Sequence, residues 1–173
     1  MRVAGRRYRT IWPNEDGRSV DVIDQRRLPH EFVVARLQTC DAAADAIRSM
    51  LVRGAPLIGA TAAYGIALAM RTDASDAALD QACKNLAATR PTAINLKWAL
   101  DAMRSTLRPL PASQRSAAAY SFAGEIAEED TAINKGIGRH GLGLIEAIAA
   151  RKKPGERVNL LTHCNAGWLA TVD

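Results

Sequence analysis

The segment V-N-L-L-T-H-C-N-A-G-W, residues 158–168, is the starting point for interpreting this chain. A short apolar run that follows Pro154 and Gly155 and leads into a helix start is typical of a buried strand in a parallel sheet. Cys164 then falls at the carboxyl end of that strand and faces a helix N-terminus. Open α/β sheets bind ligands there, and the helix dipole favours a thiolate. The alternative is a small cysteine buried for packing alone. Cys164 is therefore a candidate catalytic residue.

The composition favours closely packed helices over a β-sandwich, because hydrophobic residues make up 48% of the chain and aromatic residues only 5%. The length of 173 residues accommodates one full core, or one domain and part of another. The formal net charge is +5, but the basic residues are scattered along the chain. Such a surface suits a small anionic ligand at least as well as nucleic acid, and we expect no nucleic-acid partner.

The cysteines and the apolar segments indicate a cytoplasmic protein without a membrane partner. Cys40, Cys83 and Cys164 are odd in number and lack C-x-x-C spacing, so neither a disulfide framework nor a metal site is expected. Residues 1–10 contain no apolar core of a secretion signal. The longest uncharged run, residues 54–70, is shorter than the roughly 20 residues that a membrane span needs, and it predicts a buried helix.

Residues 1–38 are predicted to form a small antiparallel β element. Residues 8–12 and 20–23 flank the segment P-N-E-D-G-R, whose Asp16-Gly17 pair is a turn signal, so we expect a hairpin. Residues 32–37 can add a third strand or a bridging segment. This element carries no candidate for catalysis and is expected to pack on a helical body.

Residues 39–155 are predicted to form a helical domain. Thr39 or Asp41 can cap its first helix, and Pro56 suits the first turn of a second helix that is apolar nearly all round. Apolar residues at helical spacing predict three more helices, the first of them over 76–88 and the last one long. The expected breaks fall at residues 52–54, 89–92, 108–111 and 152–155.

The apolar stripe of the last predicted helix is interrupted by polar residues near Asp130 and His140. Such residues either face a cavity or mark a bend, and Gly136, Gly138, Gly141 and Gly143 make a bend credible. The polar candidates for lining a pocket here are Asp130, Asn134 and His140.

Two helix starts in the sequence share a design that suits an anion. Arg53 precedes one of them, in R-G-A-P-L-I-G, and Arg90 precedes the other, in T-R-P-T-A-I-N-L. A helix N-terminus presents free N–H groups and a partial positive charge, and arginine adds a planar two-pronged donor for phosphate or carboxylate. Gly54 would let a ligand approach the backbone closely. The alternative is that both arginines cap the preceding helices; together with Cys164 they favour one anionic pocket.

The chain resembles the amino-terminal half of the methylthioribose-1-phosphate isomerase family, which is homologous to the regulatory subunits of translation initiation factor 2B. The resemblance covers essentially all 173 residues. The segments that carry it are R-T-I-W-P, I-D-Q-R-R-L-P-H-E-F, M-L-V-R-G-A-P-L-I-G-A-T-A-A-Y-G, A-T-R-P-T-A-I-N-L-K-W-A-L, A-I-N-K-G-I-G-R-H-G and L-T-H-C-N-A-G-W-L-A-T-V-D.

The resemblance implies an aldose–ketose isomerase of methionine salvage, part of amino-acid biosynthesis. It would convert 5-methylthioribose 1-phosphate to 5-methylthioribulose 1-phosphate without a cofactor or a metal, and as a homodimer when full length. Motif by motif, Cys164 would be a catalytic residue. The matching substrate-binding residues are Arg53, Gly54, Ala55 and Arg90, and further candidates for lining the pocket are His163, Asn165 and Gly167.

The resemblance also predicts that this chain is an amino-terminal fragment. Family members are about twice as long, and their second half is a Rossmann-like domain that supplies an aspartate as proton donor. The expected fold is therefore mixed α/β: the β element, the helical domain, and in residues 156–173 the first strand and helix start of a Rossmann-like domain that is otherwise absent. We expect such a chain to be inactive alone. The alternatives are a regulatory module that binds nucleotides or partner proteins, as in initiation factor 2B, and a related isomerase of ribose 1,5-bisphosphate.

Overall fold

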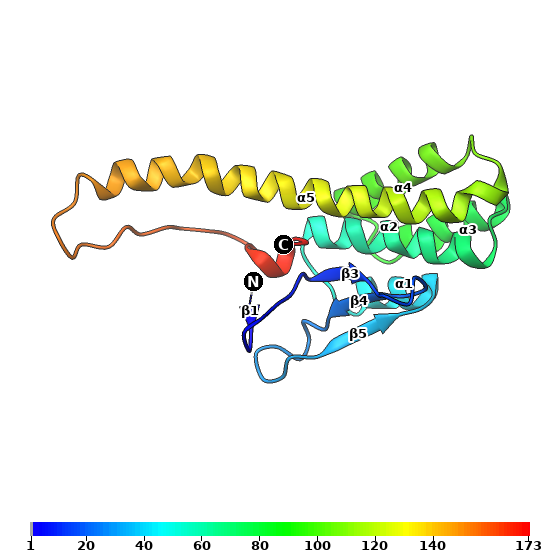
Figure 1. Ribbon diagram of the computed structural model, residues 1–173, viewed down its shortest axis with the longest axis horizontal. Coiled ribbons are helices and arrows are strands. Elements are labelled where there is room, and N and C mark those ends of the chain that lie inside the picture. The colour runs from blue at the N-terminus through cyan, green and yellow to red at the C-terminus, as the bar shows by residue number, and fades with distance from the viewer. Residues whose placement is uncertain (1) are drawn as a thin grey trace.

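The computed structural model, which describes residues 2–173, is organised around helix α2, Ala55–Thr72 (Figure 1). Most of α2 is buried, and α1, α3, α4 and α5 all pack against it. The mixed α/β class expected from the sequence is confirmed. The other helices are α1 (Cys40–Arg48), α3 (Asp76–Ala87), α4 (Ile94–Leu107), α5 (Ala112–Ala149) and the 3₁₀ turn η1 (Trp168–Ala170).

Helix α2 is central because its sequence lacks a polar face and carries small residues where neighbours come close. Leu57, Ile66 and Leu68 are at most 1% exposed. At Gly59, a Cβ atom would lie 3.2 Å from the carbonyl oxygen of Asn95 in α4, so the missing side chain lets the two helices approach closely. The prediction of a buried helix here is confirmed. No helix within residues 2–173 is both long and apolar enough to cross a membrane.

Helix α1 begins where the sequence predicts a cap. The Thr39 side chain accepts a hydrogen bond from the backbone N–H of Ala42 at 3.0 Å, which satisfies one of the free donors of the first turn.

Replacing Thr39 with alanine should lower the free energy of unfolding by about 1 kcal/mol, because the Ala42 N–H loses its side-chain acceptor. Denaturant unfolding followed by circular dichroism measures the change. The matched control is Thr39→Ser, which keeps the hydroxyl. Its free energy of unfolding should stay within about 0.5 kcal/mol of the parent value. Equal midpoints for the alanine and serine variants would contradict the role of the cap.

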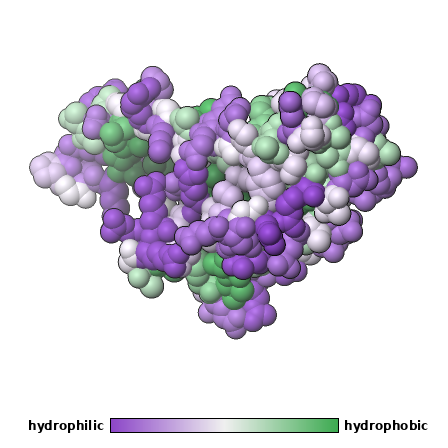
Figure 2. All heavy atoms as spheres, turned by 45° about the vertical axis from the view of Figure 1, so that its right-hand side comes forward, coloured by the Kyte–Doolittle hydropathy of each residue, from purple (hydrophilic) through white to green (hydrophobic). Residues whose placement is uncertain are grey.

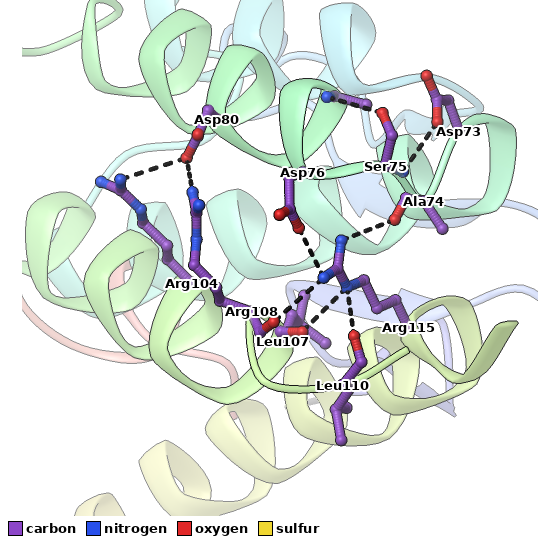
Figure 3. Close-up of polar contacts among 11 residues, drawn as sticks. Asp73, Ala74, Ser75, Asp76, Asp80, Arg104, Leu107, Arg108, Leu110 and Arg115 are labelled. Carbon is purple, nitrogen blue, oxygen red and sulfur yellow. Dashed lines mark hydrogen bonds and ion pairs between the residues drawn. The ribbon is translucent and has the colours of Figure 1, made fainter. Parts of the chain in front are cut away.

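One buried arginine joins the ends of three helices (Figure 3). The Arg115 side chain is 7% exposed and forms an ion pair with Asp76 at the start of α3. Its guanidinium also donates to backbone carbonyl oxygens between α2 and α3 and at the end of α4. Those acceptors are Ala74 at 2.9 Å, Leu107 at 3.0 Å, Arg108 at 3.1 Å and Leu110 at 2.9 Å. Arg115 therefore fixes the far end of the bundle.

The predicted N-terminal hairpin is present as the first pair of a three-stranded antiparallel sheet. Its strands β3 (Ile11–Pro13), β4 (Val20–Ile23) and β5 (Val34–Leu37) lie in that order, and β4 is buried throughout. The sheet packs on the bundle through β3 against α2 and β5 against α1. A smaller hairpin, β1 (Arg2–Val3) with β2 (Arg6–Arg7), was not predicted.

Helix α5 runs without interruption over 38 residues, so the predicted bend at its glycines is wrong. Gly136 and Gly143 have no atoms packed where a Cβ would point, and the helix continues through them. Glycine in an exposed helix lowers its stability without forcing a kink, which needs a lost hydrogen bond or an inserted group. The distal half of α5 extends beyond the bundle as an arm (Figure 1).

The prediction of a strand over residues 158–164 is also wrong for this structure. The segment is an extended return from the tip of α5 and pairs with no strand in residues 2–173 (Figure 1). Leu160 is 72% exposed and Leu161 is fully exposed. A strand needs a neighbour to complete its hydrogen bonds, and the described part of the chain places no strand beside this segment. The expected helix start at Asn165 is replaced by the single turn η1.

Candidate functional site

The start of α2 is built to accept a negative charge. Gly54 caps the helix with φ 105° and ψ 133°, Pro56 lies in the first turn, and no side chain caps the turn. The first turn also contains no acidic residue. The positive end of the helix dipole therefore favours an anion near this turn.

The C-terminal segment returns to this helix start from 112 positions away in the sequence. The Asn165 side chain donates to the Arg53 carbonyl oxygen at 3.3 Å, and Ala170 packs directly on Gly54. A Cβ atom at residue 54 would lie 2.5 Å from the Ala170 carbonyl oxygen, so only glycine allows this contact. The R-G-A-P and T-H-C-N-A-G segments therefore meet in space.

Further hydrogen bonds anchor the last residues of the chain on α5 and on two segments that flank the sheet. The Thr10 N–H donates to the Val172 carbonyl oxygen at 3.0 Å, and the Val172 N–H donates to the Asp130 carboxylate at 2.7 Å. The Gln25 side chain donates to the Leu169 carbonyl oxygen at 2.6 Å. These bonds join the sheet and α5 to the turn that covers Gly54.

Gln25 is a residue at this site that sequence reasoning missed. It is 1% exposed, its N–H donates to the Leu51 carbonyl oxygen at 2.9 Å, and its own carbonyl accepts from Arg53 Nη2 at 3.3 Å. Its Oε1 atom, Arg53 Nε and Trp168 Nε1 are buried without a partner among the described residues. The available signal was its place in I-D-Q-R-R-L-P, a segment that carried the resemblance but no assigned role.

Of the three cysteines, Cys164 is the one whose side chain faces solvent. It has φ 62° and directly precedes Asn165, which contacts Arg53. Burial raises the pKa of the Cys40 thiol to about 12 and that of the Cys83 thiol to about 11, so both stay protonated and unreactive near neutral pH. The exposed cysteine therefore lies next to the candidate anion site.

Arg90 lies elsewhere. It lines a cavity of about 440 Å³ between α3 and α4, together with Lys84, Lys97 and Arg104, and neither Arg53 nor Cys164 lines that cavity. The structure thus brings Cys164 and Arg53 into one neighbourhood and leaves Arg90 on the other side of the α4 start. A substrate-binding role for Arg90 stays a prediction, as do the roles of Arg53, Gly54, Ala55 and Cys164.

Asp130 is half-buried at a second cavity beside the start of α2. It accepts from the Val172 N–H and, at 3.0 Å, from the Asn134 side chain, while burial raises the pKa of its carboxyl group. The cavity also contains Pro56 and Gly59 of α2. Of the remaining candidates, His140 is exposed on distal α5, far along the arm, and His163 is exposed on the returning segment beside Cys164. Gly167, with φ 93°, caps η1, the turn that packs on Gly54.

Fold and site together define a class: a mixed α/β protein with a candidate anion site where a helix start meets a returning C-terminal segment. Residues 51–172 match the Initiation factor 2 subunit family, and the chain belongs to that family. The resemblance found in the sequence is thereby confirmed.

Individual relatives agree with this assignment. The methylthioribose-1-phosphate isomerase of Brucella anthropi is 65% identical over the whole chain. Among solved structures, the 5-methylthioribose 1-phosphate isomerase from Pyrococcus horikoshii matches 95% of the chain with a TM-score of 0.78 and 37% identity. The translation initiation factor eIF-2B subunit delta from A. fulgidus matches 96% with a TM-score of 0.79 and 35% identity. The chain spans about half of these proteins: 48%, 46% and 48% of their lengths, respectively.

Proposed function

We propose that this chain supplies one half of the substrate site of an aldose–ketose isomerase that converts 5-methylthioribose 1-phosphate to 5-methylthioribulose 1-phosphate. The observation that carries the proposal is that Arg53 meets Asn165 of the T-H-C-N-A-G segment and that Gly54 meets Ala170, three residues beyond that segment. The 65% identity to a protein named for that isomerase supports the choice of substrate.

In the proposed reaction the sugar ring opens and hydrogen moves from C2 to C1, so that the C2 hydroxyl becomes a carbonyl. The N–H groups at the start of α2 and the Arg53 guanidinium hold the phosphate. Cys164 exchanges a proton at the reacting carbons. The resemblance assigns the second proton-transfer group to an aspartate in the other half of the family's fold.

The exposed apolar residues of the arm support a further part of this proposal. Ile137 and Leu144 of α5 are 64% and 71% exposed, and Leu160 and Leu161 lie on the returning segment. Figure 2 shows this apolar surface as green spheres over distal α5. We propose that residues 158–164 become a strand when they pair within the Rossmann-like half expected from the resemblance. The proposed domains remain the β element of residues 1–38, the helical domain of residues 39–155 and the start of the Rossmann-like domain from residue 156. The proposal also includes a homodimer, a cytoplasmic location and no turnover by residues 1–173 alone.

Calorimetric titration of the 173-residue chain tests the proposed ligand. The chain should bind 5-methylthioribose 1-phosphate, and Arg53→Met should raise the Kd by about tenfold or more, because a charged pair of hydrogen bonds to phosphate is lost. Arg48→Met is the matched control, since Arg48 is 57% exposed and forms an ion pair with Asp45 on the surface of α1. Binding of nucleotides in place of the sugar phosphate would favour the regulatory alternative. An unchanged Kd in Arg53→Met would overturn the phosphate contact.

A further inference from the structure

Gln25 is a buried polar residue for which the proposed phosphate contacts have no use. It lies just beyond the end of β4, is 1% exposed, and bonds through its main chain to the loop before α2. Its N–H donates to the Leu51 carbonyl oxygen at 2.9 Å, and its carbonyl oxygen accepts from Arg53 Nη2 at 3.3 Å. Gln25 therefore holds one terminal nitrogen of the guanidinium to which the phosphate is assigned.

The Gln25 side chain reaches the C-terminal turn on the other side of the helix start. Its Nε2 atom donates to the Leu169 carbonyl oxygen at 2.6 Å, within η1. The next residue of that turn, Ala170, is the one that packs on Gly54. One buried glutamine thus joins the Arg53 guanidinium to the turn that covers the start of α2.

Three buried polar atoms of these joined segments have no partner among the described residues. One is an acceptor, Gln25 Oε1, and two are donors, Arg53 Nε and Trp168 Nε1. A polar atom buried without a hydrogen bond costs free energy, so such a group in a native protein needs an explanation. An amide oxygen has two lone pairs and can accept from both donors. Gln25 therefore has the bonding capacity that Arg53 and Trp168 lack.

The charges at this position favour a neutral partner for Arg53. Asp24, the carboxylate next to Gln25 in the chain, is already paired with Arg26 at 2.7 Å. An amide oxygen orients a guanidinium without cancelling its charge, whereas a carboxylate would compete with a phosphate for it. A glutamine beside Arg53 therefore leaves the guanidinium able to attract an anion.

We propose that Gln25 is a positioning residue that orients the Arg53 guanidinium toward the phosphate of the ligand. Its main-chain carbonyl holds Nη2, and its Oε1 accepts from Arg53 Nε and Trp168 Nε1 when the ligand is bound, which leaves Nη1 to the phosphate. Holding the guanidinium in place lowers the ordering cost of binding. The inference rests on the proposed function, which assigns the phosphate to Arg53.

A double-mutant cycle tests this role by calorimetric titration of the 173-residue chain with 5-methylthioribose 1-phosphate. Gln25→Met keeps most of the volume but removes both polar atoms, and it should raise the Kd by about 5- to 10-fold, as for one lost hydrogen bond. In the Arg53→Met background the same change should alter the Kd by less than about twofold, because no guanidinium is left to orient. A merely structural role of Gln25 would give the same factor in both backgrounds.

Gln25→Glu is a second variant of nearly unchanged shape, which keeps the role testable if Gln25→Met does not fold. Its carboxylate should pair with Arg53 and repel the phosphate, so the Kd should rise by about 100-fold.

Two controls separate this effect from lost stability and from the chemical change itself. Thr39→Ala loses the cap of α1 and should keep the parent Kd. Gln81→Met makes the same exchange at an exposed side chain that bonds to Asn85 in α3, and it should also keep the parent Kd.

The outcomes distinguish this inference from the proposed function. If Arg53→Met weakens binding but both Gln25 variants keep the parent Kd, or if Gln25→Met acts equally in both backgrounds, Gln25 does not orient Arg53 although the proposed function stands. If the parent chain does not bind the sugar phosphate, the proposed function fails and this inference fails with it.

Discussion

Replacing Gly54 with alanine is expected to lower the free energy of unfolding by about 2–5 kcal/mol, from backbone strain and from overpacking together. Gly54 has φ 105°, a conformation that residues with a Cβ rarely adopt. A Cβ atom there would also lie 2.5 Å from the carbonyl oxygen and 2.6 Å from the Cβ of Ala170. Because backbone atoms of Ala170 make this contact, a side chain could not simply turn aside. The whole C-terminal turn would have to move away from the start of α2.

The same change should weaken sugar-phosphate binding, because the turn that carries Asn165 contacts Arg53 next to Gly54. Thermal and denaturant unfolding measure the stability, and calorimetric titration measures the binding. Gly136→Ala is a control with the opposite expected sign: Gly136 is helical with open space around it, so alanine should raise stability by about 0.5–1 kcal/mol. Parent-like stability of Gly54→Ala would contradict the packing of Ala170 on Gly54.

Replacing Arg115 with methionine is expected to lower the free energy of unfolding by about 3–5 kcal/mol. Methionine keeps most of the side-chain volume but removes every donor from four backbone carbonyl oxygens (Figure 3). These carbonyls lie around a side chain that is 7% exposed, so water replaces the lost bonds poorly. The loss should appear as a lower midpoint in denaturant unfolding.

Arg104→Met is the matched control for Arg115, because it lies on the adjacent helix end and pairs with Asp80 at 3.3 Å in a largely exposed setting (Figure 3). Its effect should stay within about 1 kcal/mol, as for other surface ion pairs. Asp76→Asn should also have a small effect, since Asp76 is 61% exposed and the carbonyl bonds of Arg115 remain. If Arg115→Met costs no more than Arg104→Met, then the carbonyl network does not hold the helix ends.

The helices were predictable because their signals are local. Thr39 caps α1, Pro56 lies in the first turn of α2, and the apolar spacing of α4 places Leu96 and Leu100 in the core. The hairpin of β3 and β4 was predictable for the same reason, since Asp16-Gly17 favours the turn between them. The bend in α5 was predicted wrongly because glycine permits a bend without producing one.

The candidate site was only partly predictable. The sequence indicated Arg53, Gly54 and Cys164 as candidates, and the structure places the segments that contain them side by side. The sequence could not show that Arg90 lines a different cavity, because that position depends on how α3 and α4 pack. Gln25 was missed since its role comes from contacts with residues 51, 53 and 169, which no pattern near residue 25 reveals.

By itself, the sequence determined the family, the order of helices and the small residues of α2, because motifs, caps and helical periodicity act over a few neighbouring positions. Only the tertiary structure decided that residues 158–164 stay unpaired and that Ala170 covers Gly54. The physical reason is that a strand needs hydrogen bonds to a second segment. A close contact at a glycine likewise needs a second stretch of backbone that approaches it. Both depend on partners distant in the chain.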